Sequence, residues 1–205
     1  MTRSSLIYLA SRSPRRRELL RQIGVVFEPI LLREAPRQPA DFDETPRAGE
    51  APDDYVPRIA REKAVVAVGI MRARRLAVHP VLTADTTVVC DDLILGKPAD
   101  AADAARMLGL LAGRMHRVLT AVAIAGGDAV EVRMSESRVW FRALAADEIR
   151  RYVATGEPVD KAGAYAVQGR AAAFITRIEG SYSGIMGLPL AETAELLRSQ
   201  GIIVP

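Results

Sequence analysis

Three consecutive arginines, Arg15, Arg16 and Arg17, stand where the sequence predicts the beginning of a helix. Ser13 is a good N-cap, and Pro14 suits the first helical position. A helix N-terminus already carries partial positive charge, so each cation there costs from a few tenths of a kcal/mol to about 1 kcal/mol. Free backbone N–H groups, the helix dipole and guanidinium groups together bind phosphate well. The pattern therefore predicts a phosphate site, with a solvated basic face as the alternative.

Hydrolysis of a phosphate also needs a metal ion or a general base, and both call for carboxylates. Asp85 lies within an apolar strand pattern, where a buried carboxylate is costly unless it is paired or bound to metal. A satisfied structural aspartate is the alternative for this residue. Asp43 and Glu44 are weaker candidates, because they belong to a charged loop. Among these carboxylates, Asp85 is therefore the first candidate for a metal ligand or a general base.

Only three of the 28 basic residues are lysines, namely Lys63, Lys97 and Lys161. A lysine kept in an arginine-rich chain indicates a place where a compact point charge must fit, and chance is the alternative for so few residues. Lys63 lies beside an apolar helical run, where a snorkelling surface lysine is the alternative. Lys97 precedes Pro98, which fixes an extended backbone and suits a rigidly presented ammonium, although a simple turn fits equally well.

The segment DKAGAYAVQG ends with a polar side chain between small residues. Gly163 and Gly169 would allow the backbone to approach a ligand closely. Gln168 carries both a donor and an acceptor, which match the imide edge of uracil or thymine. An ordinary loop is the alternative interpretation.

The elements that must position these side chains alternate between strands and helices. Strands are expected at residues 6–10, 25–32, 80–89, 118–125, 130–141 and 171–178, and helices at 14–23, 53–75, 101–111, 146–154 and 191–199. Strands 118–125 and 130–141 are expected to form a hairpin, and 33–52 a long exposed loop. The order predicts an α/β fold with a mixed, twisted sheet flanked by helices.

Composition narrows the class of protein. A chain of 205 residues suits one domain, and its net charge of +3 is too small to argue for nucleic-acid binding. The single cysteine, Cys90, excludes an internal disulfide and is expected to be a buried, inert thiol. No apolar run reaches the length of a membrane span, and no signal peptide is recognisable, so the expected compartment is the cytoplasm.

The motifs together resemble one family. SRSPRRRELL, FDET, REKA, TADTTVV, GKP, LTAVAI, DKAGAYAVQG and GSYSGIMGLPL occur in the order seen in the Maf family, from about Leu6 to Leu197. The resemblance implies a cytoplasmic, metal-dependent nucleoside triphosphate pyrophosphatase whose subgroup acts on dTTP and UTP. It also implies a single domain over residues 1–205 with two lobes around a cleft, similar to inosine triphosphatases, and it is compatible with a homodimer.

The resemblance also implies roles for nine residues. Catalytic roles fall on Asp85, Glu44 and Lys63, and Glu44 and Asp85 would hold Mg²⁺ or Mn²⁺. Substrate contacts fall on Ser11, Arg15, Arg16, Lys97, Thr86 and Gln168, of which Arg16, Thr86 and Gln168 correspond to positions that set specificity. The stretch before FDET is longer than usual in the family, which leaves Asp43 as an alternative to Glu44.

Three other functions stay open from the sequence. The first is hydrolysis of 7-methyl-GTP or another modified nucleotide, and the second is a nucleotide-binding regulator of cell division without turnover. The third is a nucleic-acid binder, which predicts strongly salt-dependent affinity for oligonucleotides. The small charge and the few aromatic residues argue against this third function, and no membrane partner is expected.

Overall fold

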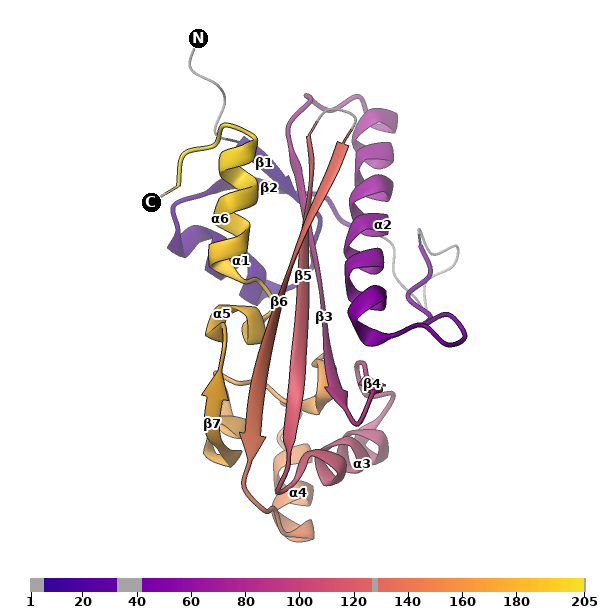
Figure 1. The fold of residues 1–205 in the computed structure, drawn as a ribbon, viewed down its shortest axis with the longest axis vertical. Coiled ribbons are helices and arrows are strands. Elements are labelled where there is room, and N and C mark those ends of the chain that lie inside the picture. Colours follow the sequence, from indigo (N-terminus) through magenta and orange to yellow (C-terminus); the bar gives the residue numbers. More distant parts are fainter. Residues whose placement is uncertain (1–5, 33–41, 127–128, 205) are drawn as a thin grey trace. The chain divides into compact units, whose positions relative to one another are not determined.

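The computed structural model describes residues 6–32, 42–126 and 129–204. Its strands form one mixed sheet in the order β2-β1-β3-β5-β6-β7, with β4 paired to β3 (Figure 1). The strands are β1 (Leu6–Leu9), β2 (Val26–Pro29), β3 (Val81–Cys90), β4 (Leu93–Leu95), β5 (Met115–Gly126), β6 (Ala129–Phe141) and β7 (Ile175–Glu179). Strand β1 is parallel to β2 and β3, whereas β4 and β7 pair antiparallel with β3 and β6. The predicted mixed α/β fold is confirmed.

Six α-helices are found among the described residues. They are α1 (Pro14–Gln22), α2 (Pro52–Ala73), α3 (Ala101–Leu111), α4 (Ala146–Val153), α5 (Tyr182–Met186) and α6 (Leu190–Ser199). The chain divides into two compact units. Unit 1 comprises Met1–Asp85, Thr120–Met134 and Gly187–Pro205, and unit 2 comprises Thr86–Leu119 and Ser135–Met186. Strand β3 passes from one unit to the other between Asp85 and Thr86.

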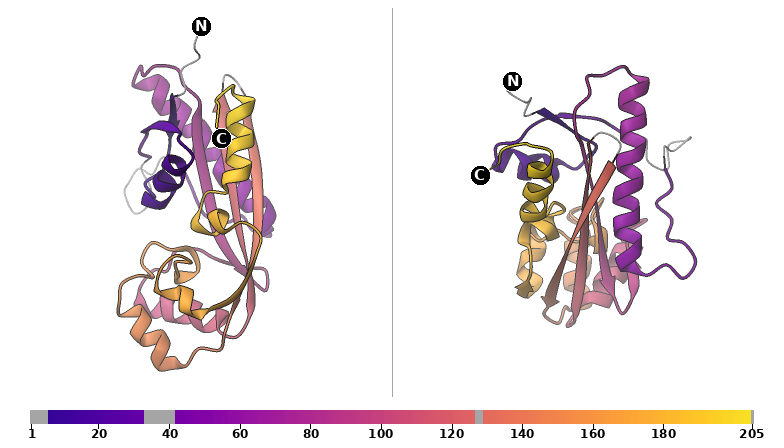
Figure 2. Two further views of the ribbon diagram at one scale, coloured as in Figure 1. Left: turned by 90° about the vertical axis from the view of Figure 1, so that its left-hand side faces the viewer. Right: turned by 45° about the horizontal axis from the view of Figure 1, so that its top comes forward.

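Unit 1 is built around the first half of β3 and the strands beside it. Helix α2 covers one side of these strands, and α1 and α6 lie on the other (Figures 1 and 2). The buried face of α2 includes Val56, Ile59, Ala60 and Ala67, which recur at the spacing of one helical stripe. This stripe fixes the helix against β3, so the polar residues at its edge take defined positions.

Unit 2 has its own apolar core, in which α3 packs against α4 and a short 3-10 helix, Ala162–Ala164. Gly163 in that helix has a φ of +65°, and a Cβ there would lie 2.7 Å from the Val88 side chain. Only glycine meets both demands without strain. The close approach that the sequence predicted at Gly163 is therefore made to β3, inside the protein.

Some predicted elements differ from those observed. The strand expected at 171–178 was wrong at its start, because Arg170–Phe174 forms a 3-10 helix and β7 begins only at Ile175. The three alanines of this segment favour strands poorly. Strand β2 is shorter than expected, and β4 and α5 were not predicted. Cys90 is a free, buried thiol, as expected, and burial raises its pKa.

None of the helices in the described part of the chain combines the length and hydropathy that crossing a membrane requires.

The burial of His116 in the core of unit 2 predicts that this residue makes the stability of the protein depend on pH. Its Nε2 lies 2.8 Å from the Tyr165 hydroxyl, and burial lowers the pKa of His116 from 6.5 to about 3. Between these values the unfolded chain binds a proton that the folded chain does not. The free energy of unfolding should therefore be highest above pH 6.5 and fall as the pH decreases toward 3.

In a His116→Gln variant this part of the pH dependence should disappear, because no imidazole remains to be protonated in the unfolded chain. Urea unfolding measured from about pH 7.5 to pH 4 tests this. His79→Gln is the control, since His79 is only half-buried and makes an edge-to-face contact with Tyr8. Equal pH dependence in wild-type protein and His116→Gln would contradict the assignment.

Candidate active site

The arginine-rich helix begins where β1 ends, beside β3. Leu9 pairs with Leu82 in parallel register, and the Ala10 amide donates to the Leu82 carbonyl at 2.9 Å. If the chain keeps this register for two more residues, Ser11 lies beside Ala84, next to Asp85. Ser11 is buried, with 7% of its surface exposed. Its hydroxyl oxygen accepts from the Ser13 amide at 3.2 Å. The first turn of α1 and Asp85 therefore belong to one edge of unit 1.

The predicted cap of α1 is confirmed, and its first turn carries no acidic residue. The Ser13 hydroxyl accepts from the Arg16 amide at 3.4 Å. Arg16 Nε donates to the Gly187 carbonyl at 2.7 Å, and its Nη1 lies 3.4 Å from the Ser11 hydroxyl. Arg15, Arg16 and Arg17 are all half-buried. Arg16 is thus held within the protein surface and does not extend freely into solvent.

Helix α2 carries the lysine of the site to Asp85. The Thr83 hydroxyl donates to the Ala60 carbonyl at 2.7 Å, which docks α2 on β3. Thr83 and Asp85 share one face of the strand, and Ala60 and Lys63 share one face of the helix. Lys63 Nζ therefore reaches Asp85 Oδ1, at 2.7 Å. The surface position considered for Lys63 is wrong, because its side chain is 9% exposed.

Lys63 joins two carboxylates. Its Nζ lies 2.6 Å from Glu44 Oε1 and 2.7 Å from Asp85 Oδ1. Burial by itself lowers the pKa of Lys63, but the charges of Asp85 and Glu44 outweigh burial and raise that pKa above its ordinary value. The charge of Arg16 acts in the opposite direction and lowers it, so Arg16 is close enough to act on the same site. Lys63 remains an ammonium ion at neutral pH.

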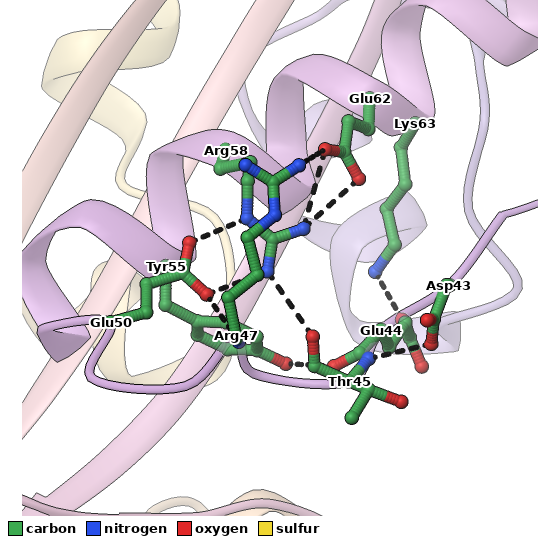
Figure 3. A network of polar contacts seen from close by, with 9 residues as sticks. All are labelled: Asp43, Glu44, Thr45, Arg47, Glu50, Tyr55, Arg58, Glu62 and Lys63. Carbon is green, nitrogen blue, oxygen red and sulfur yellow. Dashed lines mark hydrogen bonds and ion pairs between the residues drawn. The ribbon is translucent and has the colours of Figure 1, made fainter.

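Glu44, rather than Asp43, contacts Lys63. Figure 3 shows the Glu44 carboxylate at the Lys63 ammonium, while Asp43 turns to its own loop. Asp43 Oδ1 accepts from the Thr45 amide at 2.9 Å, and hydrogen bonds from the side chain and the amide of Thr45 lower the pKa of Asp43. This contact is the local turn that aspartate commonly makes with the backbone two residues on. The geometry favours Glu44 of the two alternatives.

Thr86, Lys97 and Gln168 belong to unit 2, so their approach to Asp85 remains a prediction. Thr86 is half-buried, and Lys97 and Gln168 are exposed. Within unit 2, the Gly163 amide donates to the Gly96 carbonyl at 3.0 Å, which joins the GKP turn to the segment that leads to Gln168. The structure thus brings together the segments of two of these three residues.

The donor set fits a divalent metal that binds together with its substrate. In the described residues, no group of three His, Cys, Asp or Glu side chains could hold a metal ion alone. Magnesium, however, is commonly held by one or two carboxylates, with phosphate oxygens and water as its other ligands. Glu44 and Asp85 already converge on one cation, the Lys63 ammonium, so their oxygens suit this arrangement.

Several residues near the site had not been recognised from the sequence. Tyr55 and Arg58 of α2 bind the loop that carries Glu44, Glu50 of that loop pairs with Arg58, and the Gly187 carbonyl accepts from Arg16. The sequence held a signal for Gly187, because GSYSGIMGLPL is a conspicuous segment of small residues. In the structure Gly187 has a φ of +112°, which favours glycine. The Arg58–Glu62 pair could also be seen as a helical i,i+4 pair. Glu50 could not be linked to Arg58, because their contact depends on how the loop folds.

Several relatives of this chain share one name. A protein of Aromatoleum aromaticum named dTTP/UTP pyrophosphatase is 60% identical over 196 residues, which cover 95% of each chain. A protein of the same name from Cupriavidus metallidurans is 56% identical, and the match covers 97% of this chain and 98% of that one. Another from Dechloromonas aromatica is 52% identical, and the match covers 95% of this chain and 97% of that one. The Ham1 protein of Staphylococcus aureus, a solved structure, is similar with a TM-score of 0.47 and 13% identity over 95% of this chain and 97% of that one.

The family comparison agrees with the motifs. The model of the Maf family, described as Maf-like protein, matches residues 6–200, which include all nine residues considered for the site. Together with the carboxylate–lysine group and the arginine-rich helix start, this match shows that the chain belongs to the Maf family.

Proposed function

We propose that this protein hydrolyses dTTP and UTP to the nucleoside monophosphate and pyrophosphate. The observation that carries the proposal is the convergence of Glu44 and Asp85 on Lys63, beside the helix start that holds Arg16. Relatives at 52–60% identity are named for this activity. Carboxylates beside cations are what a polyphosphate substrate and its metal ion require.

The cations bind and orient the triphosphate. Ser11, Arg15 and Arg16 would contact phosphate oxygens at the N-terminus of α1, where backbone N–H groups also point. Lys63 and Lys97 would add two ammonium groups. Positive charge fixed around the leaving pyrophosphate stabilises the negative charge that develops there, and its placement requires no rearrangement during the reaction.

The carboxylates act on the attacking water. Asp85 would orient a water molecule toward the α-phosphorus and accept its proton, while the bond from the α-phosphorus to the bridging oxygen breaks and that oxygen leaves with pyrophosphate. Glu44 and Asp85 would hold Mg²⁺ or Mn²⁺, which supplies Lewis-acid stabilisation of phosphate charge. Lys63 would keep the two carboxylates together when the metal is not bound.

A nucleotide panel tests the proposal. Purified protein with Mg²⁺ is given dTTP, UTP, CTP, dCTP, ATP, GTP and 7-methyl-GTP separately, and pyrophosphate release is measured. The proposal expects the highest kcat/KM for dTTP and UTP. A preference for 7-methyl-GTP would contradict dTTP and UTP as the substrates. Nucleotide binding without any pyrophosphate release would instead favour a regulator without turnover.

Gln168 is proposed to recognise the base together with Thr86. A Gln168→Ala variant should lose about tenfold to a hundredfold in kcat/KM for dTTP and UTP, because the imide edge loses its partner. The rates with purine triphosphates should change little. Gln22→Ala, an exposed glutamine at the end of α1, is the control and should behave as wild type. An equal loss with all triphosphates would contradict base recognition by Gln168.

We also propose, from the family resemblance, that the protein acts in the cytoplasm, where its substrates are made, and that it forms a homodimer. Light scattering of the purified protein tests the oligomer.

A further inference from the structure

A dense polar network fastens the loop that carries Glu44 to helix α2 (Figure 3). The Tyr55 hydroxyl donates to the Glu44 carbonyl at 2.9 Å. Arg58 Nη2 donates to the next carbonyl along the chain, that of Thr45, at 3.3 Å. Two side chains of one helix thus hold two successive carbonyl groups, those of Glu44 and the residue after it.

Arg58 is itself fixed by carboxylates on two sides. Its Nε and Nη2 donate to the two oxygens of Glu50 at 2.5 and 2.7 Å, and its Nη1 donates to Glu62 at 3.1 Å. The side chains of Arg58 and Glu50 are only 14% and 10% exposed. The arginine lowers the pKa of Glu50 to about 2, so this ion pair persists through the neutral range. A buried, bidentate pair has little freedom to move.

The loop closes on the same pair. Glu50 Oε2 also accepts from the Arg47 amide at 2.9 Å, and the Glu50 amide donates to the Arg47 carbonyl at 3.0 Å. The side chain of Arg47 reaches Glu62 at 3.2 Å. Residues 44–50 are therefore tied to α2 at both ends of the turn, and α2 is the helix that also carries Lys63.

Glu44 needs such support more than the other members of its group. Its side chain is 39% exposed, compared with 9% for Lys63 and 12% for Asp85. Asp85 is fixed by its strand and Lys63 by its helix, whereas Glu44 lies outside any regular element. A carboxylate on a loop holds its place only as well as the backbone that carries it.

We infer that Tyr55 and Arg58 are positioning residues, which hold the Glu44 carboxylate where it meets Lys63 and, in the reaction, the metal. The inference rests on the proposed function for its role in catalysis, although the position of Glu44 can be tested without turnover. Residues that orient metal ligands commonly change metal affinity or activity by about 10- to 100-fold when they are replaced.

The test uses Tyr55→Phe, which removes one hydroxyl, and Arg58→Lys, which keeps the charge but loses the guanidinium group that donates to several oxygens at once. Both should raise the Mg²⁺ concentration for half-maximal pyrophosphate release about tenfold, and saturating Mg²⁺ should restore most of kcat. Arg142→Lys is the matched control. Two nitrogens of Arg142 also donate to one carboxylate, that of Glu148, at 2.7 and 3.1 Å, and the side chain donates to the Ala173 and Ala143 carbonyls. Arg142 lies in unit 2, whereas Glu44 lies in unit 1.

A second measurement on metal-free protein does not depend on activity. The chain has only three lysines, so isotope labelling of lysine gives few side-chain NMR signals, and that of Lys63 reports on Glu44 directly. The nitrogen chemical shift of the Lys63 ammonium at neutral pH should change in Tyr55→Phe and Arg58→Lys as Glu44 moves away, and it should stay unchanged in Arg142→Lys.

The outcomes separate the two claims. If wild-type protein releases no pyrophosphate, the proposed function fails, and the chemical shift of the Lys63 ammonium still decides whether Glu44 is positioned by the network. If wild-type protein is active and the Tyr55 and Arg58 variants match Arg142→Lys in Mg²⁺ dependence and in the chemical shift of the Lys63 ammonium, the positioning inference alone is overturned.

Discussion

Replacing Asp85 with asparagine is expected to lower kcat for pyrophosphate release by about 10³-fold, because the amide can neither accept the proton of water nor bind the metal as a carboxylate does. The fold should survive. Asparagine has nearly the same shape, and Lys63 keeps Glu44 as a charged partner. The free energy of unfolding should fall by about 1–3 kcal/mol, which is typical when one partner of a buried polar contact is weakened.

The control for this experiment is Asp103→Asn. Asp103 is also ion-paired, with Arg106 on the surface of α3 at 2.7 Å, and it has no part in the proposed chemistry. Its replacement should leave kcat unchanged. Circular dichroism and thermal unfolding of Asp85→Asn show whether any lost turnover has a structural cause. Full turnover in a folded Asp85→Asn protein would remove this residue from the mechanism.

Lys63→Arg is expected to be nearly as damaging, although the charge is unchanged. The Lys63 side chain is 9% exposed and fits its ammonium between two carboxylates at 2.6 and 2.7 Å. A guanidinium is larger and planar, so it must displace Glu44 or Asp85. The misplaced carboxylates should lower kcat/KM for dTTP by about 10²-fold, and overpacking should cost about 1–3 kcal/mol of stability.

Lys161→Arg is the matched control for Lys63→Arg. Lys161 Nζ donates to the Val159 carbonyl at 2.9 Å at a half-buried position, where arginine can make the same contact. Steady-state kinetics with dTTP should show wild-type values for this variant. If Lys63→Arg were also fully active, the requirement for a compact ammonium at this position would be refuted.

The residues that could be predicted are those whose local pattern conflicts with their surroundings. Ser13 and Pro14 mark the start of α1, and the arginines that follow are unfavourable there without an anion. Asp85 stands out because a carboxylate in an apolar strand needs a partner. The partner proved to be Lys63, whose place on α2 follows from the same stripe that buries Ala60. Helix boundaries followed from capping residues and apolar spacing to within a few residues.

Features that depend on contacts across the chain could not be predicted in this way. The choice between Asp43 and Glu44 was decided by how the loop lies on α2, which no local pattern specifies. Glu50 and Arg58 meet only after that loop has closed. Similarly, residues 171–174 were mistaken for the start of a strand, because a short apolar run does not distinguish a strand from a 3-10 helix. The positions of Thr86, Lys97 and Gln168 relative to Asp85 stay predictions.

The most direct test of the account is to follow the oxygen of the attacking water. The purified protein hydrolyses dTTP with Mg²⁺ in water enriched in the heavy isotope of oxygen. The products are separated, and their masses are measured by mass spectrometry. The account predicts equal amounts of thymidine monophosphate and pyrophosphate, with the heavy oxygen in the monophosphate alone. Heavy oxygen in pyrophosphate, or release of the diphosphate and inorganic phosphate, would contradict attack at the α-phosphorus.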